Sequence, residues 1–258
     1  MAAGRSPSTQ ETWDAFFSEF YLRVHAAESR REVEVAREQA RAAARLAKTP
    51  EGGTLLDVPC GFGRHAIPLA EDGFDVTGVD RAAALLEEAK RRGEGPTWVL
   101  GDYRELPFAD ASFDAAINLY TSLGYLGDEE DTAVLAEIAR VLKPGGRLVI
   151  ETMHRDLLVR TFDESAWNRV GEGRLLLQQR AFDPVTGVAQ DTQTLIDSDG
   201  TRESQTFATR IYSATELVAM VRAAGFEKAT AYGDLTGAPF DTGTRLVLVA
   251  RTPQDPAA

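Results

Sequence analysis

Between residues 54 and 152, short apolar runs alternate with helical patterns, and this alternation constrains the fold more than any other feature. The apolar runs, typical of buried strands, lie at 54–58, 74–79, 97–101, 113–118 and 147–152. Helical spacing of apolar residues fills 63–72, 81–92 and 130–142. Strands joined by helices pair in parallel, because each crossover returns the chain to the same edge of the sheet. The sequence therefore predicts an α/β fold whose parallel sheet is covered by helices on both faces.

The segments on either side of this region do not show the alternation of strands and helices. Thr12–Val24 has aromatic and apolar residues at helical spacing, Trp13 among them, and Glu28–Ala47 predicts a second helix rich in Arg and Ala. Residues 174–212 contain three strand-like runs joined by turn sequences at 183–187 and 197–200, which predicts an antiparallel insertion.

The C-terminal part returns to the α/β pattern. Ser213 and Glu216 form a capping-box sequence before a helix that stops at Gly225, and strands are predicted at 226–233 and 244–251. We expect three units along the chain. They are a helical lid at 1–50, a core at 51–166 and 213–258, and an antiparallel cap at 167–212.

The charge balance excludes some partners. The formal net charge is −12, and residues 51–150 alone hold 18 acidic and 9 basic side chains, a net of −9. Affinity for phosphate backbones comes from clustered Lys and Arg, so we expect neither a nucleic-acid partner nor a membrane surface. Cys60 is the single cysteine and cannot form an intramolecular disulfide, which favours a cytoplasmic location. A homo-oligomer stays open.

A ligand-binding motif lies between the first predicted strand and helix. In the sequence LLDVPCGFGRHA, at 55–66, Gly61 and Gly63 lack a Cβ that would keep a ligand away from the backbone. Asp80 ends the second strand, where a carboxylate can accept both hydroxyls of a ribose. Asp102 follows the third strand. The motif alone fits a dinucleotide as well. Asp102 suits the amine of an adenine, and the last helix and two strands fit a closing antiparallel strand rather than the second mononucleotide half of a dinucleotide-binding fold, which favours S-adenosylmethionine.

The combined motifs resemble the class I S-adenosylmethionine-dependent methyltransferases, and in particular the small-molecule group of glycine and amino-sugar N-methyltransferases. The resemblance rests on LLDVPCGFGRHA, GFDVTGVD, GDYRELPF, FDAAINLYTSLGYL, LKPGGRLVIET and YSATELVAMVRAAGF. It implies a Rossmann-like fold with a mostly parallel seven-stranded sheet and a reversed last strand. Pro59 departs from the Gly or Ala usual at its position, and it has no amide N–H to offer a cofactor.

The resemblance also implies which residues contact the cofactor. Asp57 orders the loop, and Asp80 takes the ribose hydroxyls. Methionine and ribose contacts fall to Pro59, Gly61, Gly63, Asn118 and Leu119, and adenine contacts to Arg81, Asp102 and Tyr103. For the cofactor's own carboxylate, the N-terminal helices offer Tyr21 as a hydroxyl donor and Arg31 as a cation, although helix packing and a solvated arginine are the plainer interpretations.

The candidates for acid–base or substrate contact follow the fourth and fifth strands. They are His154, Tyr120 and Tyr125, and a surface histidine is the ordinary alternative for His154. His25, His65 and His154 are too dispersed for a metal motif, so we expect no metal. A desolvated pocket that lowers the pKa of an amine is a second route to a reactive acceptor.

We therefore expect methyl transfer to a small-molecule acceptor, at nitrogen rather than oxygen, by in-line displacement. An O-methyltransferase and a non-catalytic S-adenosylmethionine-binding module stay open, and a nicotinamide-dependent oxidoreductase is the third alternative. Residues 167–212 either line the substrate mouth or mediate contacts between subunits. Arginine-rich, lysine-poor usage indicates a bacterial source.

Overall fold

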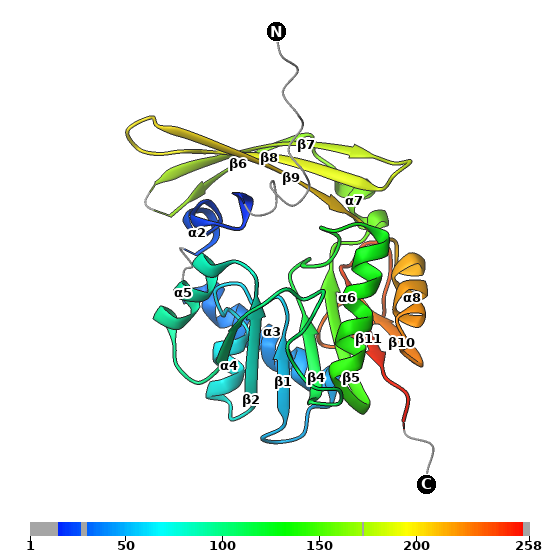
Figure 1. The fold of residues 1–258 in the computed structure, drawn as a ribbon. Coiled ribbons are helices and arrows are strands. Elements are labelled where there is room, and N and C mark those ends of the chain that lie inside the picture. Colours follow the sequence, from blue (N-terminus) through cyan, green and yellow to red (C-terminus); the bar gives the residue numbers. More distant parts are fainter. Residues whose placement is uncertain (1–14, 27–29, 172, 255–258) are drawn as a thin grey trace.

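The computed structural model describes residues 15–26, 30–171 and 173–254, which form two β-sheets flanked by helices (Figure 1). The larger sheet has seven strands in the order β10-β11-β5-β4-β1-β2-β3. Their bounds are β1 Thr54–Asp57, β2 Asp75–Asp80, β3 Thr97–Leu100, β4 Phe113–Asn118, β5 Leu142–Thr152, β10 Lys228–Tyr232 and β11 Leu246–Arg251. Strands β1 to β5 pair in parallel, whereas β11 is antiparallel to both β5 and β10. The predicted α/β fold with a reversed last strand is confirmed.

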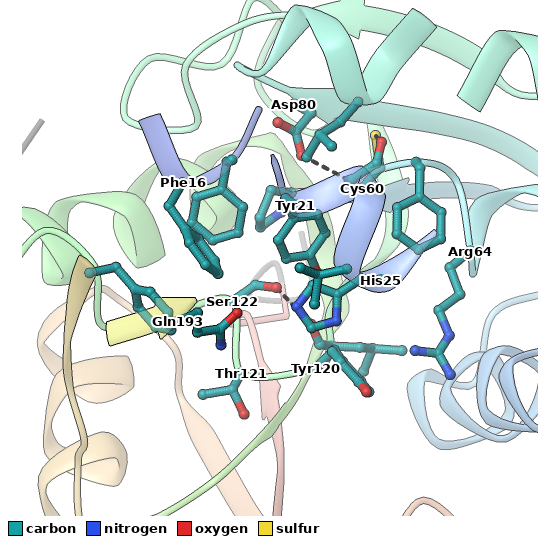
Figure 2. A pocket seen from close by; sticks show the side chains of 18 of the residues that line it. Phe16, Tyr21, His25, Cys60, Arg64, Asp80, Tyr120, Thr121, Ser122 and Gln193 are labelled. Atoms are coloured by element: carbon teal, nitrogen blue, oxygen red, sulfur yellow. Dashed lines mark hydrogen bonds between the residues drawn. The ribbon is translucent and has the colours of Figure 1, made fainter. Parts of the chain in front are cut away.

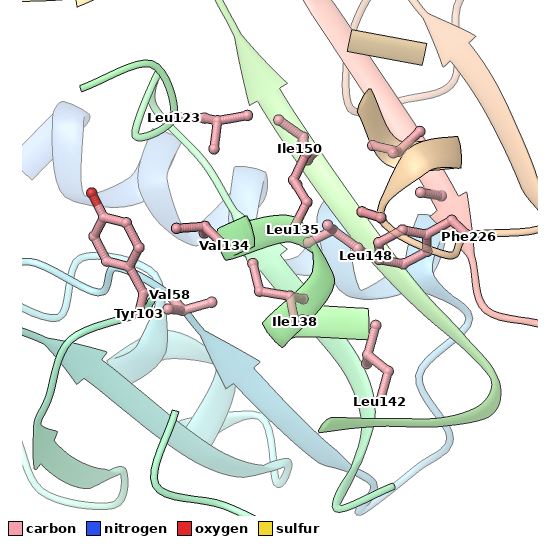
Figure 3. Packing of buried hydrophobic residues seen from close by; sticks show 14 of the residues in the cluster. Val58, Tyr103, Leu123, Val134, Leu135, Ile138, Leu142, Leu148, Ile150 and Phe226 are labelled. Carbon is pink, nitrogen blue, oxygen red and sulfur yellow. The ribbon is translucent and has the colours of Figure 1, made fainter. Parts of the chain in front are cut away.

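Helices cover both faces of this sheet. One face packs against α6 (Asp128–Val141) and α8 (Ala214–Ala223), and Figure 3 shows the resulting cluster, in which Ile138 meets the strand residue Leu148. The opposite face packs against α3 (Arg30–Ala47) and α4 (Ala66–Glu71), and α5 (Ala83–Arg92) lies beside β2 and β3. The alanines of α3 are buried against the sheet, so of the expected N-terminal lid only α2 (Glu19–His25) faces the second sheet. Trp13 and Glu28 lie outside the described residues.

The strand order reverses between β1 and β4. From β1 the chain moves outward to β2 and β3, and it then crosses to β4 and β5 on the other side of β1. The loops that leave the carboxyl ends of β1 and β4 therefore diverge and leave a crevice between them. Open α/β sheets bind ligands at such a switch point.

The smaller sheet is antiparallel and has the order β6-β7-β8-β9. Its bounds are β6 Ser165–Val170, β7 Arg174–Asp183, β8 Val188–Ile196 and β9 Arg202–Arg210. It lies across the carboxyl edge of the larger sheet, with α2 between the two (Figure 1). The sequence predicts β7, β8 and β9 but not β6, whose side chains are mostly exposed and therefore show no apolar alternation.

Two other local differences have clear causes. The chain passes directly from α6 into β5 at Leu142, so β5 begins five residues before the predicted strand at 147–152, and Lys143–Gly146 lies inside it at a register shift. Helix α7 (Arg155–Thr161) has no fully buried side chain and gave no apolar periodicity. The capping box of Ser213 and Glu216 is confirmed. Within the described ranges, no helix is long and apolar enough to cross a membrane.

Candidate active site

A cavity of ≈ 580 Å³ lies where the strand order reverses, and we call it the central cavity. The loops after β1 and β4 form its floor, α2 closes one side, and strands β6 to β9 form its roof. Ligand pockets in proteins commonly have volumes of about 300–1,000 Å³. The central cavity therefore has room for a cofactor together with a small second molecule.

The loop after β1 presents its backbone to the central cavity at Gly61. Cys60 N donates to Val79 O at 2.9 Å, which ties the loop to β2, and Gly61 has a φ of +54°. A Cβ on Gly61 would have no heavy atom within 4 Å, so this side of the loop is open to a ligand. Gly63 differs from its predicted role. It does not line the cavity, and a Cβ there would stand 2.7 Å from the Trp98 ring, so close packing explains this glycine.

Asp80, at the end of β2, is a buried carboxylate on the cavity floor. Its Oδ2 accepts from Gly61 N and its Oδ1 accepts from Ala82 N, both at 2.8 Å. The side chain is 3% exposed, and burial raises its pKa to about 6 against the lowering effect of these hydrogen bonds. Each oxygen keeps a second lone pair for a ligand hydroxyl. The carboxylate is thus pre-oriented to accept two hydroxyl donors from one ligand.

Asp57 and Asn118 lie beneath the loop and do not line the cavity. Asp57 is fully buried, and burial followed by the charge of Asp80 raises its pKa well above the usual value. Asn118 Nδ2 donates to Val58 O at 2.8 Å, which joins the end of β4 to the loop after β1. Both residues are placed to hold the loop rather than to touch a ligand.

The predicted adenine residues are only partly brought together. Tyr103 is buried and lines the cavity, whereas Arg81 and Asp102 do not. Asp102 accepts from Arg104 Nη2 at 2.6 Å and lies 3.7 Å from Arg81 Nη1. Partial burial acts against ionisation, but the hydrogen bonds from Arg104 prevail and lower the pKa of Asp102. An adenine amine would therefore have to share Asp102 with Arg104.

The arginines that line the cavity, Arg64 and Arg169, do not include the predicted Arg31. Arg31 is exposed on α3 and does not line the cavity, because that face of the helix points away from the sheet. Arg64, which directly follows the glycine loop, does line it, with its guanidinium 4.7 Å from the centre of the Tyr120 ring. Tyr21 enters from α2 as predicted, and burial raises the pKa of its phenol above the usual range. Tyr21 is therefore a hydrogen-bond donor at neutral pH.

Of the three predicted acid–base residues, two line the cavity and one does not. Tyr120 and Tyr125 line the cavity with the backbone neighbour Leu119, and burial raises the pKa of Tyr125 to about 12. His154 is 0% exposed and does not reach the cavity. Its Nε2 donates to Thr244 O at 2.9 Å and its ring centre lies 5.1 Å from that of Phe240, so the ring packs against the loop before β11. The prediction of His154 as a base at this site is corrected by that placement.

Several residues of the wall were not predicted as site residues. His25 stacks on Tyr21 with ring centres 4.4 Å apart, and burial lowers its pKa to about 4, so its imidazole is neutral at neutral pH. Gln178 and Gln193 reach the wall from β7 and β8. For Arg64, its position directly after Gly63 in the glycine loop was a sequence signal that could have indicated a site residue. A glutamine in a strand carries no motif, so only the folded chain reveals it.

Comparison with known proteins agrees with this geometry. Residues 55–146 match the family described as a methyltransferase domain. A demethylmenaquinone methyltransferase of Beutenbergia cavernae is 41% identical over 99 residues, which are 38% of this chain and 40% of that protein. A dTDP-3-amino-3,4,6-trideoxy-alpha-D-glucopyranose N,N-dimethyltransferase of Streptomyces venezuelae is 34% identical over 105 residues, which are 40% of this chain and 44% of that protein. The matches thus span less than half the length of either relative.

A solved structure extends the similarity to nearly the whole chain. CalS10, an amino pentose methyltransferase from Micromonospora echinaspora with bound S-adenosylmethionine, has a TM-score of 0.68 and 26% identity, and the alignment covers 97% of this chain and 99% of CalS10. Together with the switch-point cavity and Asp80, these similarities define the class. Residues 55–146 carry a methyltransferase domain, and the chain as a whole has the fold of the class I S-adenosylmethionine-dependent methyltransferases. Its structural similarity includes the antiparallel sheet and not only the cofactor-binding half.

Proposed function

We propose that the protein transfers a methyl group from S-adenosylmethionine to a nitrogen atom of a small molecule bound under the antiparallel sheet. The observation that carries the proposal is the placement of Asp80 in the floor of a cavity that β6 to β9 close from above. The floor fits the cofactor because a buried carboxylate and the open backbone of Gly61 lie side by side there. The roof leaves space for a second molecule.

The residues of the floor have separable tasks in this proposal. S-adenosylmethionine, when bound, supplies a methyl group activated by the positive charge of its sulfonium. Asp80 accepts the ribose hydroxyls, and Arg64 with Tyr21 holds the cofactor's carboxylate through charge-assisted hydrogen bonds. Tyr103 packs beside the adenine. These contacts fix one reactant, so that positioning of the acceptor supplies much of the rate acceleration.

The roof and α2 keep water away from the reacting atoms. Phe16 and Phe207 are in contact, with ring centres 4.0 Å apart, and Phe17 meets Tyr125 at 5.2 Å. An amine desolvated among these rings has its pKa lowered, because burial disfavours the charged ammonium. More of the amine then carries the free lone pair that attacks the methyl group. In this proposal the phenols of Tyr120 and Tyr125, which both line the cavity, orient the amine.

The choice of nitrogen rests on the relatives. Two proteins similar to this chain are named for methylation of amino sugars or transfer to an amino pentose. The demethylmenaquinone methyltransferase is 41% identical over a stretch of similar length, against 34% for the amino-sugar enzyme, so similarity in that part of the chain does not select the acceptor. The similarity to CalS10 over the roof is the feature that favours nitrogen.

Two measurements test the proposed function. Calorimetry should show binding of S-adenosylhomocysteine and no binding of NAD. Transfer of a labelled methyl group should then be found with amines, in a panel that pairs each small amine with the alcohol of the same carbon skeleton. Binding of NAD without S-adenosylhomocysteine would overturn the class of reaction, and turnover of the alcohols alone would overturn the choice of nitrogen.

The assignment of the cation makes a separate prediction. Arg64→Gln should raise the Kd for S-adenosylhomocysteine about 20-fold, because a charge-assisted hydrogen bond contributes roughly 1.5–3 kcal/mol. Arg31→Gln is the matched control and should leave the Kd unchanged within about twofold, since Arg31 is exposed outside the cavity. A larger increase in Kd for Arg31→Gln than for Arg64→Gln would show that Arg31, not Arg64, binds the cofactor's carboxylate.

A further inference from the structure

Two glutamines face each other across neighbouring strands of the cavity roof. Gln178 on β7 and Gln193 on β8 are directly paired in the antiparallel register, and both line the central cavity. Gln178 Nε2 donates to Asp191 Oδ2 at 3.1 Å, and Gln193 Nε2 donates to the same oxygen at 3.2 Å. Arg180 Nε lies 3.8 Å from that oxygen. One carboxylate thus collects the donors of both amides.

This arrangement determines which way each amide points. A carboxylate can only accept hydrogen bonds, so each glutamine must turn its NH2 group toward Asp191 and its carbonyl oxygen away. Gln178 Oε1 accepts from Asn168 Nδ2 at 3.4 Å. Gln193 Oε1 is buried with no hydrogen-bond donor in the part of the chain that the structure describes, and the residue is 4% exposed. A buried acceptor without a donor is rare in folded proteins, and it indicates that a ligand supplies the donor.

The surroundings of Gln193 restrict that ligand further. Figure 2 shows Gln193 across the cavity from Asp80, so it lies on the side opposite the proposed cofactor floor. The aromatic rings of Phe16, Phe207 and Tyr125 line the same space. An amide whose NH2 donates to a carboxylate is polarised, which makes its oxygen a stronger acceptor. An amine N–H donor on a compact apolar skeleton matches this wall.

We propose that Gln193 Oε1, oriented by Asp191, binds the N–H group of the methyl acceptor and thereby selects amines over compounds that only accept hydrogen bonds. The inference rests on the proposed function for the identity of the ligand as methyl acceptor. The binding of an N–H donor at Gln193 depends only on the geometry of the roof. Gln193 is a specificity-determining residue in this proposal, and Asp191 is a positioning residue that acts through it.

Binding of three probes of matched shape tests the proposal. Cyclohexylamine, cyclohexanol and cyclohexanone are titrated into the protein saturated with S-adenosylhomocysteine, and binding is followed by ligand-observed NMR. The wild-type protein should bind cyclohexylamine at least about tenfold more tightly than cyclohexanone, which has no donor. Gln193→Met keeps the length of the side chain but removes the acceptor, and it should bring the amine to the affinity of the ketone. Equal affinities of amine and ketone for the wild type would overturn the proposal.

Two further variants separate this role from general damage to the sheet. Gln190→Met makes the same change at an exposed position of β8 and should leave all three affinities unchanged. Asp191→Asn presents an NH2 group that Gln193 Oε1 can accept from, so the amine should lose affinity several-fold while S-adenosylhomocysteine binds normally. If Gln193→Met binds S-adenosylhomocysteine normally and keeps its preference for the amine, Gln193 is not the selecting residue.

The outcome is distinguishable from failure of the proposed function. Binding of S-adenosylhomocysteine is measured first and by itself, and its absence contradicts the proposed function. If S-adenosylhomocysteine does not bind, the three probes are titrated into the free protein, and the affinities of amine and ketone for the wild type and Gln193→Met are compared as before. Normal binding of S-adenosylhomocysteine without discrimination among the probes contradicts only the role of Gln193.

Discussion

Asp80→Ala should weaken binding of S-adenosylhomocysteine by at least about 100-fold, because the variant loses two hydrogen bonds from ribose hydroxyls to a charged carboxylate. Those bonds are strong here because Asp80 is buried and already held by Gly61 N and Ala82 N. The measurement is calorimetry of the variant and of the wild type at pH 7.5. The effect exceeds that expected for Arg64, which makes one contact at the edge of the ligand.

A matched control lies on the same strand. Asp75 is exposed at the opposite end of β2, so Asp75→Ala removes the same carboxylate without touching the cavity and should leave the Kd unchanged. Asp80→Asn keeps one acceptor oxygen and should fall between the wild type and Asp80→Ala. A Kd for Asp80→Ala within about threefold of the wild-type value would remove the ribose assignment.

The pH dependence of binding gives a second measure of the same group. Burial raises the pKa of Asp80 to about 6 in the free protein, and ribose hydroxyls bind the ionised carboxylate better than the protonated one. Affinity is therefore full above pH 6 and falls as the pH drops through that value, by a limiting factor of about ten per pH unit. Asp131, whose pKa burial also raises to about 6, lies outside the cavity wall and titrates in both proteins. Asp80→Asn should flatten the profile, and an unchanged profile would contradict the assignment.

Gly124→Ala should lower the free energy of unfolding by about 3 kcal/mol more than Gly127→Ala, as measured by urea denaturation. Gly124 has a φ of +108°, and a Cβ there would stand 2.2 Å from the carbonyl oxygen of Arg210. Arg210 N donates to Gly124 O at 2.7 Å, so the loop after β4 and the end of β9 pair closely. Alanine must push these two backbones apart, which detaches the roof of the cavity from its floor.

Gly127 supplies the matched control three residues away. Its φ is +93°, its N–H donates to Asp131 Oδ2 at 3.1 Å, and a Cβ there would meet no atom within 4 Å. Gly127→Ala should therefore lower the free energy of unfolding through backbone strain alone, by on the order of 1–3 kcal/mol. Equal losses in the two variants would show that the contact with Arg210 contributes nothing. The predicted difference isolates the close approach between roof and floor.

The residues of the cofactor floor were the most predictable part of the site. Asp80 and Gly61 belong to a strand–loop–helix pattern whose spacing is local, and parallel strands bring their carboxyl ends to one edge whatever the side chains elsewhere. Arg31 was predicted from the family resemblance of the N-terminal helices, and His154 from its place directly after the fifth strand. Their positions depend on which face of α3 packs on the sheet and on how β11 covers β5, and neither is encoded locally.

The residues of the cavity roof were also not predictable from local sequence patterns. Gln193 is an ordinary strand residue in sequence, and its role arises only from its pairing with Gln178 and the charge of Asp191. The antiparallel insertion itself was predicted from its turn sequences, apart from β6. Which face of that sheet meets the cavity was not, because alternation is weak in strands whose two faces are both polar.

By itself, the sequence determined the α/β core, the reversed last strand, the glycine loop and the carboxylate that follows β2, because each depends on short-range patterning. Only the tertiary structure decided that Arg64 lines the cavity and Arg31 does not, that His154 is buried away from the cavity, and that Gln193 lies in the roof with an acceptor unpaired among the described residues. The position of the roof over the floor and the burial of His154 depend on contacts between segments more than 50 residues apart, such as Arg210 with Gly124 and His154 with Thr244. Such contacts produce no periodic pattern in the sequence, because they form and stabilise the protein only when the two sheets come together.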